Sequence, residues 1–235
     1  MQTLQLVEQS RSPLRILCLG AHADDIEIGC GGSILTFAES RERPIEVCWV
    51  VFSARGERRR EALKASALFL RDIQRKRVIV RNHRDGFFPY QGAGIKEFFE
   101  RLKKEYAPDV IFTHYRDDRH QDHRLISDLT WNTFRSHLIL EYEVPKYDGD
   151  LGSPNLFMEL SPSILGTKVT HIVRAFRSQH HRQWFSEDTL RALPRLRGIE
   201  SGGGQSFAEA FYCRKLLVAG TPGRAPLGET AGRVW

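Results

Sequence analysis

The chain has 235 residues, 41% of them hydrophobic and 27% charged, a balance that excludes an intrinsically disordered chain. A chain of this length can bury a sufficient core without disulfides or a structural metal, so we expect any metal to serve catalysis. The formal net charge of +6 suits an anionic partner, but the basic residues form no single patch, and their densest run, Arg55–Arg60, is broken by Gly56 and Glu57.

The cysteines and the N-terminal segment indicate the cellular compartment. None of the four cysteines forms a CxxC pair, and Cys18 and Cys48 stand in apolar runs that predict buried thiols. Residues 1–13 lack the apolar core of a signal peptide, and no run approaches the roughly 18 apolar residues of a membrane helix. We therefore expect a cytoplasmic protein that makes no membrane contact.

Short apolar runs alternate with amphipathic segments along the first half of the chain. The predicted strands are Leu14–Leu19, Ile45–Phe52, Arg77–Val80 and Val110–Thr113. Apolar side chains at helical spacing predict helices over Gly32–Glu39, Glu57–Leu70, Ile95–Tyr106 and Leu125–Leu138. The alternation predicts an α/β fold of the Rossmann-like type, with a largely parallel sheet and helices on both of its faces.

The second half is less regular. Further strands are predicted over Leu138–Glu143 and Phe211–Val218, a helix over Lys168–Ser178, and a loop over Pro145–Pro154. We expect one domain over residues 1–235, with an N-terminal arm at 1–13. The segment 221–235 is rich in glycine and proline and is predicted to be an irregular tail.

A cluster of ionisable residues follows the first predicted strand, in the sequence AHADD. It places His22 beside the carboxylates of Asp24 and Asp25. Adjacent like charges are costly unless a cation neutralises them, and histidine and aspartate are standard zinc ligands. A polar loop of similar composition is common, so this cluster alone does not establish a metal site.

A second cluster, HQDH, follows the fourth predicted strand and contains His120, Asp122 and His123. Because ligands bind beyond the carboxyl ends of parallel strands, both clusters are expected at the same edge of the sheet. Catalytic zinc usually takes three protein ligands and leaves one position for water, and the remaining carboxylates and imidazoles supply acid–base groups. Together the clusters predict a catalytic zinc site with acid–base groups beside it.

At these residues the sequence resembles the LmbE/PIG-L family of zinc-dependent N-deacetylases, whose motifs are (A/P)HxDDE and HxxH. The motifs stand here as AHADDIE at residues 21–27 and HQDH at residues 120–123. The resemblance covers roughly residues 14–130. Ala23 and Gln121 replace prolines of the motifs, and Glu27 is displaced by one position, but none of these departures removes a ligand.

The resemblance implies that His22, Asp25 and His123 bind one zinc ion per chain. It also implies that Asp24 is the general base on the metal-bound water. His120 would stabilise the oxyanion and protonate the leaving amine.

The resemblance implies a substrate as well. Arg58 and Asp85, from segments that also resemble the family, would hold sugar hydroxyls. In the catalytic group itself, Asp122 would hold the His120 ring. The implied reaction removes an N-acyl group, typically acetyl, from a small amino-sugar compound, with amide cleavage of a sugar–thiol conjugate as an alternative. Whether the chain forms a homo-oligomer is left open.

Two other classes of protein fit parts of the sequence. The acidic, glycine-rich run from Asp25 to Gly32 looks like the loop of an S-adenosylmethionine-dependent methyltransferase, but the apolar run that should lead into it ends at Leu19. The positive charge suits a nucleic-acid-binding module, yet the chain has no zinc-finger spacing, RNP-type aromatic motif or basic recognition helix. We therefore expect no nucleic-acid partner.

Overall fold

Seven strands form one mixed sheet in the order β3-β2-β1-β4-β5-β7-β6. The computed structural model describes residues 3–6, 12–40 and 42–217. The strands are β1 (Leu14–Gly20), β2 (Ile45–Val51), β3 (Arg75–Val80), β4 (Val110–His114), β5 (Leu138–Tyr142), β6 (Leu156–Leu160) and β7 (Phe207–Cys213). The first five run parallel, and the two C-terminal strands are antiparallel to their neighbours.

The strand order creates a switch point between β1 and β4. From β1 the chain moves outward through β2 and β3 and then returns to place β4 on the other side of β1. In such sheets a crevice opens beyond the carboxyl ends of the strands at the point where the direction reverses. AHADD follows β1 and HQDH follows β4, so both histidine clusters lie at that crevice.

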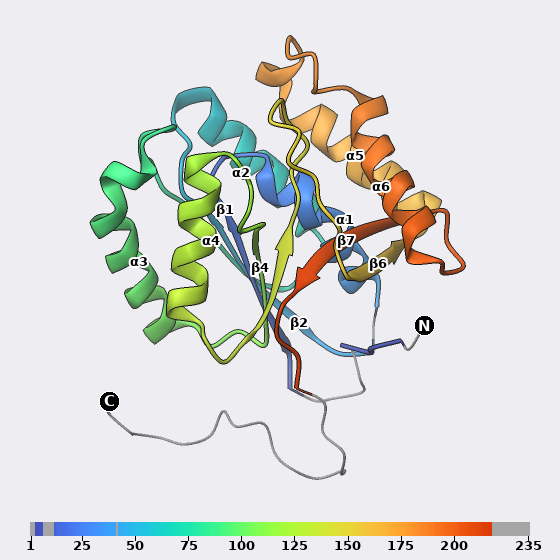
Figure 1. The fold of residues 1–235 in the computed structure, drawn as a ribbon, viewed down its shortest axis with the longest axis horizontal. Coiled ribbons are helices and arrows are strands. Elements are labelled where there is room, and N and C mark those ends of the chain that lie inside the picture. The colour runs from blue at the N-terminus through green and yellow to red at the C-terminus, as the bar shows by residue number, and fades with distance from the viewer. Residues whose placement is uncertain (1–2, 7–11, 41, 218–235) are drawn as a thin grey trace.

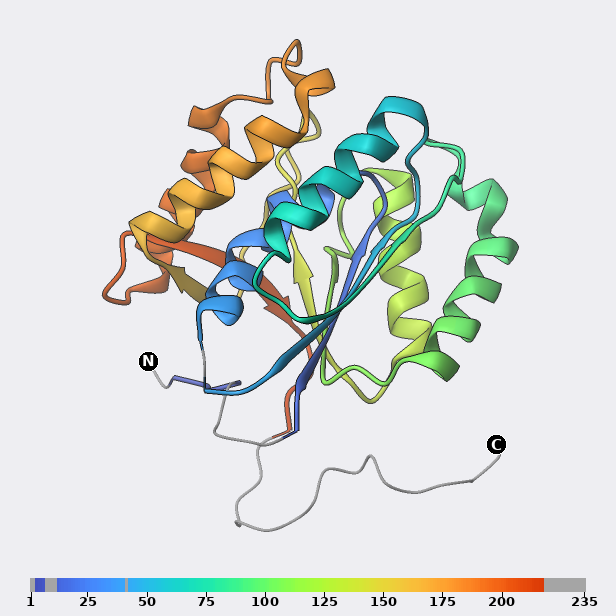
Figure 2. The same cartoon turned by 180° about the vertical axis from the view of Figure 1, so that it is seen from behind.

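Helices cover both faces of the sheet. α1 (Asp25–Glu39), α2 (Gly56–Phe69) and α5 (Pro162–Ala175) pack on one face, and α3 (Gly92–Glu105) and α4 (Gln121–Thr133) pack on the other (Figures 1 and 2). α6 (Glu187–Ser201) lies beside β7 and α5. The predicted Rossmann-like fold, with helices on both faces of a largely parallel sheet, is confirmed.

The central strand β1 shows why the sheet is apolar on both faces. Ile16 and Cys18 belong to the core beneath α1, α2 and α5, whereas Leu17 and Leu19 belong to the core beneath α3 and α4. A strand buried on both sides requires a nearly continuous apolar run, as LRILCL supplies. The prediction of buried thiols is also confirmed, because Cys18 and Cys48 are both fully buried.

Helix α1 begins at Asp25, seven residues before the predicted start at Gly32. The glycines of this segment lie inside the helix because neighbouring side chains press against it. A Cβ atom on Gly29 would lie 2.1 Å from the Tyr142 ring, and one on Gly31 would lie 2.5 Å from the Phe69 ring. The run is thus a close-packed helix, which leaves the methyltransferase interpretation without the loop that it requires.

Helix α4 also differs from its predicted bounds. It begins at Gln121 rather than Leu125, because His120 acts as its N-cap and accepts a hydrogen bond from the Asp122 backbone N–H. It ends at Thr133 rather than Leu138, which instead begins β5. The HQDH motif therefore spans a helix start, and this placement directs the side chains of His120 and His123 into the crevice.

The largest differences lie in the second half of the chain. Strand β6 and helix α6 were not predicted, and β7 begins at Phe207 rather than Phe211. Helix α5 begins at Pro162 rather than Lys168, and the Ser161 hydroxyl caps this start.

The predicted tail at 221–235 lies outside the described residues, and the single-domain organisation stays a prediction. None of the described helices is long and apolar enough to cross a bilayer.

Candidate active site

A cavity of about 640 Å³ lies beyond the carboxyl ends of the parallel strands. Its walls come from the loops after β1, β2 and β3, the start of α4, the segment after β5 and the segment around Gln179–Trp184. Each site residue expected from the sequence lines this cavity except Asp122, which lies beneath it. The cavity-lining members are His22, Asp24, Asp25, Arg58, Asp85, His120 and His123.

Three side chains meet at one point of the cavity floor. His22 Nδ1 lies 3.1 Å from His123 Nε2, and Asp25 Oδ2 lies 3.4 Å from the first atom and 3.5 Å from the second. A tetrahedral ion with bonds of about 2.0–2.1 Å keeps its ligand atoms about 3.3–3.4 Å apart. The triangle of donor atoms therefore has the size that zinc requires.

The protons of the two imidazoles point away from this triangle. His123 Nδ1 lies 2.9 Å from Asp118 Oδ2, and because a carboxylate only accepts, Nδ1 carries the proton and Nε2 presents a lone pair. His22 Nε2 lies 3.0 Å from Asp85 Oδ1 and 3.2 Å from Asp122 Oδ2, so in the neutral ring Nε2 carries the hydrogen and Nδ1 presents a lone pair. When both rings are neutral, lone pairs from two nitrogens and a carboxylate oxygen face one another, an arrangement that a cation or a proton on His22 relieves.

The electrostatics of the two imidazoles differ. Burial lowers the pKa of His123 to about 3, so this ring is neutral at neutral pH, the form that binds metals. Burial also acts to lower the pKa of His22, but Asp25 and Asp122 outweigh it and raise that pKa well above its ordinary value. A proton on His22 and a metal ion therefore compete for the same place.

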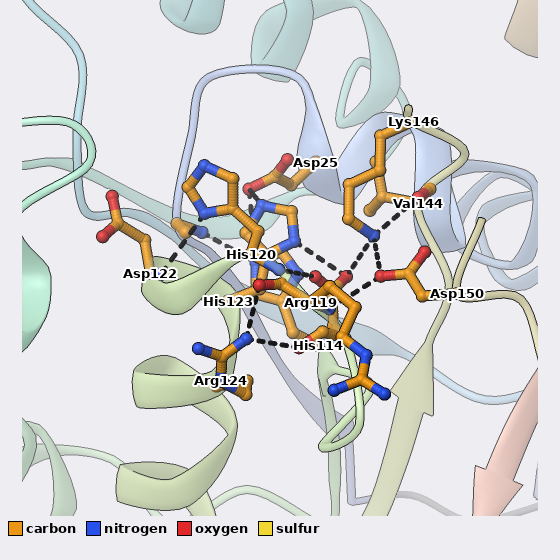
Figure 3. Close-up of polar contacts among 12 residues, drawn as sticks. Asp25, His114, Arg119, His120, Asp122, His123, Arg124, Val144, Lys146 and Asp150 are labelled. Atoms are coloured by element: carbon orange, nitrogen blue, oxygen red, sulfur yellow. Dashed lines mark hydrogen bonds and ion pairs between the residues drawn. The ribbon is translucent and has the colours of Figure 1, made fainter. Parts of the chain in front are cut away.

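Asp118 supports the site from outside the triangle. Its carboxylate accepts from His123 Nδ1 at 2.9 Å and from Lys146 Nζ at 2.8 Å, and it is almost fully buried. The ammonium of Lys146 also pairs with Asp150 (Figure 3). A carboxylate on the far nitrogen of a metal-binding histidine fixes the ring and raises its basicity. Asp118 therefore orients His123 toward the triangle.

His114, at the end of β4, lies on the buried side of the same cluster. Its ring stacks on His123 with centroids 3.9 Å apart, and its Nε2 accepts from the Ala21 backbone N–H at 2.9 Å. The same nitrogen lies 3.2 Å from Asp25 Oδ2. His114 thus packs against two of the three triangle residues from below.

Other sets of side chains in the described residues also have metal-binding spacing. Three overlapping groups have ligand atoms within 4.8 Å of one another: His22, His120 and His123; Asp25, His114 and His123; and His22, Asp85 and Asp122. All of them include a residue of the triangle. The potential ligands are therefore concentrated at one point of the cavity.

Asp24 and Asp25 point in different directions. Asp24 Oδ1 lies 2.7 Å from Arg58 Nη2, and Arg58 Nη1 lies 2.9 Å from Glu61 Oε2. Burial raises the pKa of Asp24, and Arg58 opposes this without cancelling it. Asp24 is therefore a buried carboxylate at the cavity wall, held by a guanidinium rather than by the histidines.

His120 lies between the triangle and the open cavity. Its ring is 4.9 Å from the ring of His22, and its Nδ1 accepts from the Asp122 backbone N–H at 3.3 Å. In the neutral ring the proton is therefore on Nε2. Burial lowers the pKa of His120, and the neighbouring His22 lowers it further.

The Asp122 carboxylate does not take the place expected from the sequence. It accepts from the backbone N–H groups of Gly86 at 2.7 Å and Phe88 at 3.0 Å, and it contacts His22 Nε2. Its contact with His120 is made by the backbone instead. Asp122 therefore orients His22 and ties α4 to the loop after β3, where Asp85 stands with its side chain 73% exposed.

Sequence reasoning missed Asp118 and Lys146 as site residues. A signal for Asp118 exists, because the loop between β4 and HQDH carries the acidic pair Asp117–Asp118. Lys146 lies in a segment expected to be a plain loop, and only the path of the chain after β5 brings it to Asp118.

Comparison with solved structures supports the fold. The chain is similar to an N,N'-diacetylchitobiose deacetylase from Pyrococcus horikoshii, with 22% identity, a TM-score of 0.65 and coverage of 84% of this chain and 82% of that one. It is similar to the conserved protein TT1542 from Thermus thermophilus, with 20% identity, a TM-score of 0.68 and coverage of 90% and 100%. A 4-carboxy-2-hydroxymuconate hydratase from Pseudomonas putida has 16% identity, a TM-score of 0.65 and coverage of 88% and 98%.

At these identities the similarities establish the architecture and not the reaction. A family model provides the assignment. The model described as "PIG-L: GlcNAc-PI de-N-acetylase" matches residues 17–134, half of the 235-residue chain. Because that match contains both histidine clusters and the strands that bring them together, the chain belongs to the PIG-L family.

Proposed function

We propose that the protein is a zinc-dependent N-deacetylase acting on a small amino-sugar compound. The observation that carries the proposal is the triangle of His22, Asp25 and His123, whose ligand atoms lie 3.1 to 3.5 Å apart. Two imidazoles and one carboxylate, with space left for water and substrate, form a donor set typical of catalytic zinc. When bound, zinc lowers the pKa of water toward about 7 and polarises the amide carbonyl.

Asp24 is the proton acceptor for the attacking water. It lies at the cavity wall next to the triangle, and burial raises its pKa toward the range in which a general base works at neutral pH. Arg58 holds the Asp24 carboxylate by its Oδ1 atom. The other oxygen of Asp24 remains to accept the water proton.

His120 is the proton donor for the leaving amine. Because its Nδ1 accepts the Asp122 N–H, the neutral ring carries its hydrogen on Nε2, which can donate a hydrogen bond to the oxyanion. A proton passes to the departing nitrogen only from the protonated ring, which returns to the neutral form, and the lowered pKa of that ring makes it a stronger acid. Hydrolysis of an amide needs both an acceptor and a donor of this kind.

Asp85 and Arg58 bind the sugar. The Asp85 carboxylate is exposed on the cavity wall, where it can accept hydrogen bonds from hydroxyl groups. Arg58 donates to Asp24 and Glu61, but a guanidinium has five N–H donors, so others remain for the substrate. Truncating Asp85 should mainly raise KM, because its carboxylate holds substrate rather than the amide. Truncating Arg58 should raise KM and also lower kcat, because Arg58 holds the Asp24 carboxylate as well.

Acetate release from a panel of N-acetylglucosaminyl compounds tests the proposal. We expect hydrolysis of at least one member, loss of the rate after chelation, and recovery with one equivalent of zinc per chain. Asp25→Ala should bind less zinc and lose the activity. A chelated protein that keeps its full rate would contradict metal dependence, and a zinc-loaded protein that releases no acetate from any member would contradict the deacetylase assignment.

A further inference from the structure

A second hollow, of about 450 Å³, opens beside the catalytic cavity. Three arginines line it, Arg55, Arg59 and Arg81, and we call it the arginine groove. Ala54 and Arg55 line both hollows, so the groove adjoins the cavity. No carboxylate lines the groove, and within residues 3–6, 12–40 and 42–217 none of the three arginines makes an ion pair.

Neutral acceptors hold two of the guanidinium groups in place. Arg55 donates from Nε and Nη2 to the Asn82 carbonyl, at 2.9 and 2.6 Å. Arg59 donates from Nη1 to the Val80 carbonyl at 2.6 Å. Val80 is the last residue of β3, and Asn82 lies two residues beyond it, so the backbone orients the side chains but leaves their charges uncompensated.

The third guanidinium, that of Arg81, has an unmet hydrogen bond. It lies over the Phe98 ring at 5.1 Å, and its Nε is buried without a partner in the described part of the chain. A buried donor without an acceptor is costly. The groove thus contains uncompensated positive charge from three arginines, and one of them, Arg81, also has a buried Nε–H without an acceptor.

Two basic groups of the catalytic cavity provide a contrast. Arg58 is paired with Asp24 and Glu61, and Lys146 is paired with Asp118 and Asp150. The charges of these two side chains are neutralised by carboxylates, whereas those of the three groove arginines are not. The positive end of the α2 dipole, whose N-cap is Arg55 and which has no side-chain cap, adds to the positive potential of the groove.

We propose that the arginine groove is an oxyanion subsite that binds a phosphate or carboxylate group carried by the substrate. The inference rests on the proposed deacetylase function, because it places the amide at the triangle and the anion in the groove. An oxyanion offers several acceptors to several guanidinium groups, and such charge-assisted bonds are the strong ones. Arg55 forms the wall that the two hollows share, so one ligand can occupy both.

Binding of inorganic phosphate to the full-length protein is the direct test, measured by titration calorimetry. Arg59→Gln should weaken the binding about tenfold or more, as expected for a lost hydrogen bond between charged groups. Arg59→Lys should restore part of it. The matched control is Arg60→Gln, which removes the same charge from an exposed neighbour on the same helix and should change the affinity less than about twofold.

Two results of the titration would overturn the subsite. Phosphate affinity that is the same in Arg59→Gln as in wild type would place the anion elsewhere, for example at the catalytic metal. Equal losses of phosphate affinity in Arg59→Gln and Arg60→Gln would show that the anion responds to the overall positive charge of the surface and not to the groove. Arg81→Gln provides a second variant, from a different element, if Arg59→Gln folds poorly.

A pair of substrates identifies the source of the anion. Arg59→Gln should raise KM for N-acetylglucosamine 1-phosphate about tenfold relative to KM for the uncharged methyl glycoside. If phosphate binding is lost but that ratio is unchanged, the groove binds a free anion and the substrate assignment is overturned. If neither compound releases acetate, the deacetylase proposal fails for these substrates, while the phosphate titration still decides whether the groove binds anions.

Discussion

The environments of Asp24 and Asp25 give two neighbouring residues different chemistry. Burial acts to raise the pKa of Asp25, but His123, His114 and His22 outweigh it, so that pKa lies well below its usual range. The pKa of Asp24 is raised, because burial outweighs the effect of Arg58. A permanently ionised carboxylate suits a metal ligand, and a more basic one suits a proton acceptor.

This difference predicts opposite outcomes for two conservative substitutions. Asp24→Asn should keep its zinc but lower kcat by about 10²- to 10⁴-fold, because an amide cannot accept the proton of water. Asp25→Asn should instead weaken zinc binding, because a neutral amide oxygen is a poorer ligand than a carboxylate. The zinc content of both purified variants, measured beside kcat, separates the two roles. An Asp24→Asn protein without metal beside a loaded Asp25→Asn protein would mean that the roles are exchanged.

Asp118 leads to a prediction that the sequence motifs alone do not make. Asp118→Asn should lower zinc affinity about 10- to 100-fold, because the carboxylate that orients His123 is lost. Asp117→Asn is the matched control, since its side chain is 66% exposed and contacts only Arg214 among the ion pairs of the described residues. Competition with a metal-binding dye measures both affinities. Equal affinities in the two variants would mean that Asp118 does not support the metal site.

At the residue scale, the sequence could predict the groups that lie within the motifs but not their partners. His22, Asp25 and His123 could be grouped because the two motifs follow neighbouring parallel strands, and the triangle brings them within 3.5 Å. The pairing of Asp122 with His22, and the approach of Lys146 to Asp118, depend on loop paths that no local pattern encodes. The roles of the motif residues in binding metal and substrate stay predictions.

At the scale of elements, Glu61 links helix α2 to the short segment η2 (Arg177–Gln179), whose next residues line the cavity. Its carboxylate accepts from the Ser178 N–H and hydroxyl, both at 2.7 Å, and from Arg58. Burial acts to raise the pKa of Glu61, but Ser178 and Arg58 outweigh it and lower that pKa. Glu61 thus contributes stability that depends on its charge.

The pH dependence of this contribution can be predicted. Because the folded-state pKa is lowered, the stabilisation is present above the unfolded value of about 4.3 and is lost as pH falls through the folded value. Glu61→Gln should therefore lower Tm near pH 7, and the difference from wild type should shrink below about pH 4. Thermal unfolding across this range measures it, with the exposed Glu97 changed to glutamine as the control. A difference that grows toward low pH would contradict the argument.

The elements that were predicted correctly are those whose apolar pattern reports burial directly, such as β1 and β2. Strand β7 was placed four residues late because Glu209, in the middle of the strand, is buried but reads as a polar interruption. Helix α6 was missed because Pro194 lies inside it. Tertiary contacts override local signals at these positions.

At the scale of the whole molecule, a buried ion pair joins the parallel and antiparallel parts of the fold. Lys168 on α5 lies 2.6 Å from Glu209 on β7 and donates to the Ile28 carbonyl of α1. Glu209 also accepts from the N–H groups of Gly32 and Ser33. The pair therefore connects the C-terminal elements to the helix that carries Asp25.

Lys168→Met should destabilise the protein by about 3–5 kcal/mol, because it leaves the Glu209 carboxylate buried without a cation. The double variant Lys168→Met/Glu209→Gln should recover part of the loss, since no buried charge remains. Denaturant unfolding followed by both circular dichroism and tryptophan fluorescence measures the change. If residues 1–235 form one domain, both signals should shift together in a single transition. A transition confined to the elements after β5, with residues 17–134 still folded, would divide the chain into two units and contradict the single-domain prediction.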